Sequence, residues 1–102
     1  MTDAKKNVVQ IESDLEPLVT KFIQNKHLQL EELRRDLNAG DFEALKMNWH
    51  KMQGASRVYG FNPIAEIGII IETAAVAEDI QTIENKISEM VIYLSEVRIE
   101  YI

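Results

Sequence analysis

The chain has 102 residues, of which 46% are hydrophobic, so it is long enough for one compact domain and too short for two. Seventeen acidic and 11 basic residues give a net charge of −6, which argues against binding to the nucleic-acid backbone. The absence of cysteine excludes disulfides, thiolate metal ligands and a cysteine nucleophile. No apolar run is long enough for a signal peptide or a membrane span. We therefore expect one cytoplasmic domain over residues 1–102.

The hydrophobic pattern has a helical period throughout, and no segment alternates strictly enough to predict a strand. A short helix is expected near residues 4–11, within an N-terminal extension (1–13) of a core that covers 14–102. A longer helix should begin at about Asp14. Polar residues 24–27 interrupt its apolar stripe, which predicts a bend or a hydrated spot there.

Three more helices are expected, joined by short turns. Gly40 suits the end of the preceding helix and Asp41 the cap of the next, which should run from Phe42 to about Val58. The last two are expected from Asn62 to about Ala77, with a proline in the first turn, and from a cap at Asp79 to about Val97. This pattern favours an all-α fold: an antiparallel up-down four-helix bundle with a short extra N-terminal helix.

His50 is expected on the exposed side of the helix predicted over 42–58. The apolar stripe of that helix is Phe42, Leu45, Trp49, Met52, Ser56 and Tyr59. At about 100° per residue, His50 points roughly 130° away from the middle of this stripe. Gly54 lies one turn further on and leaves the imidazole approachable, which gives a steric reason for a glycine that costs roughly 1 kcal/mol in a helix. His27 has no small neighbour at that spacing and is expected to be ordinary solvated surface.

Other kinds of site find little support in the sequence. The two histidines are 23 residues apart and have no His-x-x-x-His or Glu-x-x-His partner, so no metal site is expected. No nucleophile-elbow motif suggests a Ser-His-Asp site, and no glycine-rich phosphate loop suggests a nucleotide site. A self-standing enzyme is therefore not expected.

The string HKMQGASRVYG, from His50 to Gly60, resembles the signature of histidine-phosphotransfer (HPt) domains. In that family the histidine is followed by an apolar residue at the second position, usually lysine at the third, and glycine at the fourth. Small residues follow at the fifth and sixth positions and glycine at the tenth. Here these positions hold Met52, Gln53, Gly54, Ala55, Ser56 and Gly60. The preceding LEELRRDLNAGDFEAL, residues 30–45, also resembles the family, and the resemblance covers the chain from about Leu15 onward.

The resemblance implies a phosphocarrier whose phosphoryl acceptor is His50. Its partners would be a response-regulator receiver domain, a sensor histidine kinase, or both. The receiver would bring the aspartate and Mg²⁺, so this chain would need no cofactor of its own and would act as a monomer. Many family members place a glutamate 22 residues after the histidine, where it can accept a hydrogen bond from the second ring nitrogen. In this chain that residue is Glu72.

Two departures from the family pattern leave alternatives open. Gln53 replaces the usual lysine, so it can contact the phosphoryl group but brings no charge, and position 69 holds isoleucine where some members have a polar residue. Three basic residues are candidates to supply the charge and to bind the partner: Lys46, Lys51 and Arg57. The docking surface is expected to centre on Met47 and Gly54. The alternative function is a non-phosphorylated adaptor that binds a receiver or another protein through the same face, and a purely structural bundle would leave Gly54 unexplained.

Overall fold

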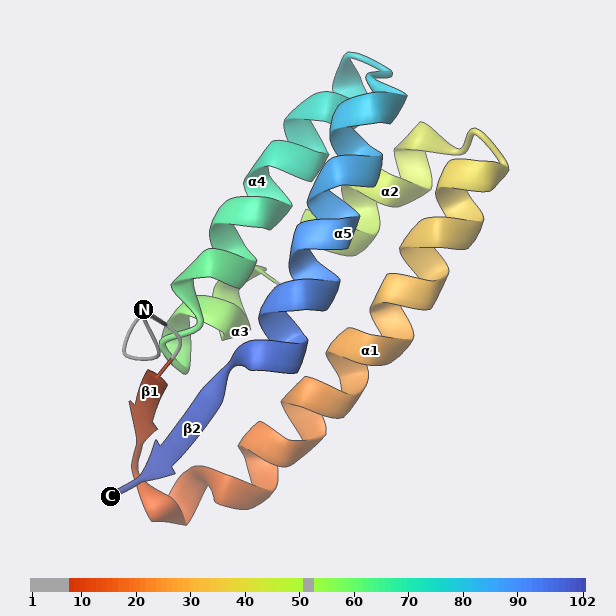
Figure 1. Ribbon diagram of the computed structural model, residues 1–102. Helices are drawn as coiled ribbons and strands as arrows, with labels where there is room; N and C mark the ends of the chain where they lie inside the picture. The colour runs from red at the N-terminus through yellow and green to blue at the C-terminus, as the bar shows by residue number, and fades with distance from the viewer. Residues whose placement is uncertain (1–7, 51–52) are drawn as a thin grey trace, which may run out of the picture.

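The computed structural model describes residues 8–50 and 53–102, with the side chains of all of these except Gln53 and Gly54. The described chain is mainly helical, as predicted, and is framed by two short strands (Figure 1). Its elements in chain order are β1 (Val8–Ile11), a 3-10 turn (Ser13–Leu15), α1 (Glu16–Asn38), α2 (Phe42–His50), α3 (Gln53–Val58), α4 (Asn62–Val76), α5 (Ile80–Glu96) and β2 (Arg98–Tyr101).

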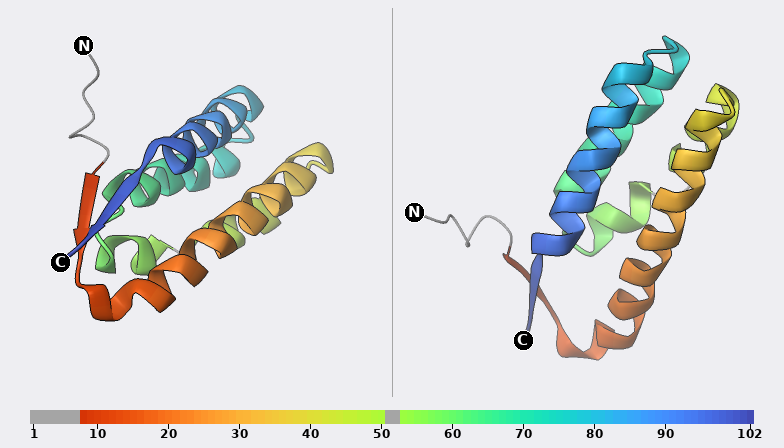
Figure 2. Two further views of the ribbon diagram at one scale, coloured as in Figure 1. Left: turned by 60° about the horizontal axis from the view of Figure 1, so that its bottom comes forward. Right: turned by 45° about the vertical axis from the view of Figure 1, so that its right-hand side comes forward.

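The long helices of the fold are α1, α4 and α5, and each extends along most of the long dimension of the molecule (Figure 1). α1 begins beside the strands and ends at the far end of the molecule, where α2 turns back. α4 again runs from the strand end to the far end, and α5 returns to β2 (Figure 2). α1 contacts α2 and α5, while α4 contacts α2, α3 and α5. Since α2 lies between α1 and α4, its outward face is flanked by both.

The N-terminal segment is a strand, and the expected helix near residues 4–11 is wrong over residues 8–11. β1 pairs with β2 in parallel, with Val8 opposite Arg98 and Ile11 opposite Tyr101. Residues 4–7 lie outside the described part of the chain. Two valines and an isoleucine in four residues favour extended backbone, but the partner strand is 90 residues away, so no local pattern could reveal the pairing.

The helix boundaries follow the capping signals in the sequence. Gly40 adopts a left-handed φ of +69° after α1, and the Asp41 carboxylate accepts a hydrogen bond from the Ala44 N–H at 3.1 Å. Asp79 caps α5 in the same way by accepting from the Thr82 N–H at 3.2 Å. This hydrogen bonding, first that of the Thr82 hydroxyl and then that of its amide, lowers the pKa of Asp79. The predicted helix over 42–58 corresponds to α2 and α3, with residues 51–52 outside the described part.

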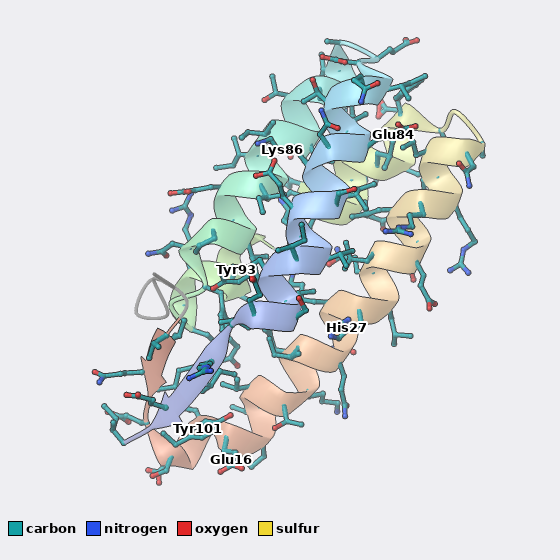
Figure 3. All side chains as sticks on the ribbon, in the orientation of Figure 1. Glu16, His27, Glu84, Lys86, Tyr93 and Tyr101 are labelled. Carbon is teal, nitrogen blue, oxygen red and sulfur yellow. The ribbon has the colours of Figure 1, made fainter. Side chains whose placement is uncertain are left out.

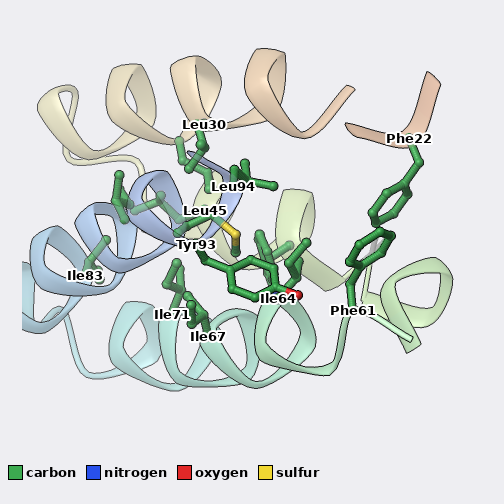
Figure 4. Close-up of a cluster of buried hydrophobic side chains, with 14 of the residues drawn as sticks. Phe22, Leu30, Leu45, Phe61, Ile64, Ile67, Ile71, Ile83, Tyr93 and Leu94 are labelled. Carbon is green, nitrogen blue, oxygen red and sulfur yellow. The ribbon is translucent and has the colours of Figure 1, made fainter. Parts of the chain in front are cut away.

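Side chains from every long helix meet in one buried core (Figure 4). Phe22 of α1 stacks on Phe61 at a ring distance of 5.4 Å, at the end of the core nearest the strands. Four apolar residues that continue the helical hydrophobic pattern of α1, α4 and α5 are nevertheless exposed: Leu18, Ile70, Ile80 and Val91. The core therefore uses a narrower stripe of each helix than the hydrophobic pattern alone suggests.

In the core, α2 and α4 approach closely where Trp49 packs over Gly68. A Cβ atom added to Gly68 would overlap the indole of Trp49, so no larger residue fits at this position without moving the indole. Trp49 is 1% exposed, and its Nε1 has no hydrogen-bond partner among the described residues. The missing hydrogen bond costs stability, which the burial of the large indole offsets.

Lys26 is buried within α1, where the sequence predicted a bend or a hydrated spot. α1 runs through this segment as one helix, and residues 24, 25 and 27 are exposed, but Lys26 is only 1% exposed. Its Nζ lies 4.9 Å from the ring centroid of Phe22 and 5.1 Å from that of Trp49, and it donates to Gln29 Oε1 at 3.3 Å. Two aromatic faces and one amide thus replace the water that a lysine normally keeps. Burial lowers the pKa of Lys26 to about 8.

The replacement Gly68→Ala should lower the free energy of unfolding by about 2 kcal/mol or more. Alanine is the better helix former by roughly 1 kcal/mol, but the overpacking of Trp49 costs more than this gain. Urea denaturation of the variant would measure the loss. The double variant Gly68→Ala/Trp49→Phe should recover part of it, and an unchanged or increased stability of Gly68→Ala would contradict the packing described here.

The stability difference between the wild type and Lys26→Met should depend on pH. Between about pH 8 and 10.5 the unfolded chain holds a proton on Lys26 that the folded chain has lost, so stability rises with pH over this window. The gain of the wild type relative to Lys26→Met should approach about 3 kcal/mol across it. Parallel denaturation curves at pH 7 and pH 10 would test this, and equal shifts in the two proteins would refute a buried, depressed lysine.

Candidate functional site

His50 is the last residue of α2 and lies on the outside of the fold. Its neighbour Trp49 points into the core, while 73% of the His50 side chain is exposed. The exposed position agrees with the expectation from the helical stripe. His27, the second histidine, is also exposed and lies on α1 (Figure 3), as expected for solvated surface. An exposed imidazole on a packed helix can meet a partner while its backbone stays fixed.

Glu72 of α4 contacts the imidazole of His50. The Nδ1 atom of His50 lies 3.1 Å from Glu72 Oε2, and the carboxylate is only 29% exposed. An ionised carboxylate can only accept a hydrogen bond, so the contact favours the neutral tautomer with the proton on Nδ1 and the lone pair on Nε2.

The approach of α2 to α4 explains why these two side chains meet. Gly68 and Glu72 are four residues apart on α4, so they lie on the same face one turn from each other. Trp49 and His50 are adjacent on α2. Once Trp49 packs over Gly68, His50 is brought to the next turn of α4. The glycine that admits the tryptophan thus also places the glutamate.

A small open pocket of about 310 Å³ adjoins the histidine. Its lining residues are Lys46, Met47, His50 and Glu72. Met47 is 55% exposed and gives the pocket an apolar wall. Lys46 is one turn before His50 on α2, and its Nζ donates to Glu43 Oε1 at 3.1 Å. All four lining residues were associated with the site in the sequence analysis, and the structure brings them together around one pocket.

The remaining predicted residues lie on or near α3. Arg57 is exposed on this helix and does not line the pocket. Gln53 and Gly54 belong to its first turn, but the side chain at position 53 and the surroundings of position 54 are outside the described part of the structure. Lys51 lies outside it entirely. The roles assigned to these three positions stay predictions.

Two hydrogen bonds between α1 and α2 fix the last turn of α2. The sequence analysis did not identify the residues that form them. Gln29 Nε2 donates to the Asn48 carbonyl at 3.0 Å, and Asn48 Nδ2 donates to Asp36 Oδ2 at 2.9 Å. Asn48 precedes Trp49 and His50, so the last turn of α2 is attached to α1 on one side and to α4 on the other. Polar residues on separate helices carry no local signal that they will meet.

Two further searches bear on the class of site. Among the described residues, no three His, Asp or Glu side chains gather where they could hold a metal ion. None of the described helices combines the length and apolarity needed to cross a membrane.

The fold is helical and presents an exposed histidine in contact with a carboxylate. In the comparison with protein families, the model described as "Hpt domain" matches residues 17–98, and the chain belongs to this family. Hpt domains are phosphocarriers of phosphorelays rather than classical enzymes, and they interact with receiver domains and kinases. The comparisons with curated proteins and with solved structures gave no match.

Removal of the Glu72 carboxylate should change the tautomer of His50. In the wild type, neutral His50 should carry its proton mainly on Nδ1, and in Glu72→Ala the proton should move mainly to Nε2. Nitrogen-15 NMR of the imidazole rings would distinguish the two forms, with His27 as an internal reference. Glu66→Ala, on an exposed position of the same helix, is the matched control. Identical His50 spectra in all three proteins would contradict the proposed tautomer.

Proposed function

We propose that this protein carries a phosphoryl group on Nε2 of His50 and passes it between receiver-domain aspartates of a phosphorelay. Membership of the Hpt family supports the class of reaction. The observation that carries the assignment to this residue is the contact between His50 Nδ1 and Glu72 on an otherwise exposed ring. His27 lies on α1, outside the string of residues 50–60 that resembles the family signature, and it does not line the pocket.

The transfer needs little from this chain besides the oriented imidazole. The lone pair of Nε2 attacks the phosphorus of an aspartyl phosphate, the N–P bond forms, and the P–O bond to the aspartate breaks. The aspartate leaves as a carboxylate, and the ring becomes a phosphorylated imidazolium with its proton on Nδ1. Glu72 lies next to that proton and stabilises the positive charge by a charge-assisted hydrogen bond. The reverse sequence hands the phosphoryl group to the next aspartate.

The partner should be a receiver domain that supplies the aspartate and Mg²⁺, and a sensor histidine kinase should stand upstream. The exposed thioether of Met47 offers an apolar contact beside the reacting nitrogen. Lys46 and Glu43 lie at the edge of this contact, where charges influence the rate of encounter. A monomer that binds one partner at a time through this face can use the same histidine with the phosphoryl donor and with the phosphoryl acceptor.

Phosphoryl transfer from a phosphorylated receiver should be abolished in His50→Gln and slowed in Glu72→Ala. Loss of one hydrogen bond to a charged group costs about 1.5–3 kcal/mol, which corresponds to a rate about 10- to 150-fold lower for Glu72→Ala. Radiolabelled phosphate on the protein should be acid-labile and base-stable. His27→Gln is the control and should transfer normally.

The same assay addresses the adaptor alternative. If receivers bind the wild type and none of them labels it, the non-phosphorylated adaptor is the better account of this face. If the label survives in His50→Gln, the acceptor is another residue and the assignment fails.

A further inference from the structure

The pocket beside His50 has an unbalanced charge once the histidine is phosphorylated. The incoming group brings about two negative charges, whereas the positive charge of the ring is already paired with Glu72, whose carboxylate lies 3.1 Å from the other ring nitrogen. Glu43 stands one turn before Met47 on the same helix and adds a further negative charge at the edge of the pocket. Like charges this close raise the energy of the phosphorylated state unless a cation joins them.

We propose that Lys46 is this cation and that its ammonium group binds the phosphoryl oxygens on His50. This inference rests on the proposed function and assigns to α2 the charge that Gln53 does not provide. Among the described residues that line the pocket, Lys46 is the only lysine or arginine. The side chain of Lys46 is 39% exposed, so it can change its conformation, and it lines the same pocket as the ring of His50.

Helix geometry brings the ring and the lysine to the same place. Side chains in an α-helix tilt toward the N-terminus, so a residue covers the turn that precedes its own Cα. His50 therefore leans over the turn that carries Lys46 and Met47. Residues four apart on a helix are neighbours on its surface, with Cβ atoms about 6 Å apart. The flexible four-carbon stem of Lys46 spans the remaining distance to a phosphoryl group on Nε2.

The existing partner of Lys46 is one that a phosphoryl group can displace. Lys46 pairs with Glu43 at 3.1 Å, but the Glu43 side chain is 72% exposed, and an exposed pair of this kind contributes only about 0.2–1 kcal/mol. A phosphoryl dianion in a half-enclosed pocket is the stronger acceptor. Glu43 thus holds Lys46 beside the pocket in the resting protein and gives it up when His50 is phosphorylated.

The decisive variant is Lys46→Gln, which keeps a polar side chain and removes the charge. Transfer from a phosphorylated receiver to this variant should be on the order of tenfold slower than to the wild type, and less phosphoprotein should be present at equilibrium. Lys46→Arg should keep most of the rate. Adding the family's usual lysine in Lys46→Gln/Gln53→Lys should restore transfer, because the family resemblance assigns to a lysine at position 53 the same neutralising role.

The chain offers a matched control on α5. Lys86 pairs with Glu89 at the same i,i+3 spacing, at 2.7 Å, and lies on a different helix from the pocket residues (Figure 3). Lys86→Gln removes the same charge and the same kind of ion pair, so it should transfer like the wild type. Equal slowing in Lys46→Gln and Lys86→Gln would show a general effect of net charge and overturn the proposal.

A binding measurement separates a phosphoryl contact from a docking contact. The unphosphorylated Lys46→Gln variant should lose much less affinity for the receiver than it loses in transfer rate, because a charge at the edge of the contact affects mainly the encounter. If its affinity falls by the same factor as its rate, Lys46 is a docking residue and the inference is wrong, although His50 remains the carrier. If the wild type itself is never labelled, the proposed function fails, and this inference fails with it.

Discussion

The packing of Trp49 over Gly68 is the contact on which the candidate site depends. It sets the distance between α2 and α4 at the place where one helix carries His50 and the other carries Glu72. A larger residue at position 68 would separate the helices and with them the two side chains. The same indole faces Lys26 of α1, so three helices are fixed relative to one another around a single residue next to the histidine. The imidazole of His50 is exposed, but the neighbouring Trp49 that supports it is buried at 1% exposure.

Much of this arrangement could be predicted from the sequence because it follows from local rules. The helical period, the glycine at position 40 and the aspartate caps place most helix boundaries within a few residues. The outward direction of His50 follows from the spacing of its apolar neighbours, and the choice of Glu72 came from the resemblance to the HPt family. The structure brings the two side chains into contact.

The features that could not be predicted all depend on contacts between distant segments. Gly68 reads as an ordinary weak point in an apolar helix until Trp49 is seen against it. Lys26 reads as a polar interruption of α1, whereas two aromatic rings and an amide from the fold make its burial tolerable. β1 reads as the start of a helix because its partner lies at the other end of the sequence. In each case the conformation or burial depends on a contact with another segment of the chain, which a local sequence pattern does not reveal.

The parallel pairing of β1 with β2 also affects the order in which the protein can fold. To pair residues 90 positions apart, the chain must close a loop that includes every helix. The conformational entropy of this loop is lost before the hydrogen bonds of the short strand pair can form and compensate for it. An isolated two-stranded sheet is marginal in water. The helices must therefore assemble first and bring the two ends of the chain together. The strands pair only after the helices have packed, so their pairing does not initiate folding.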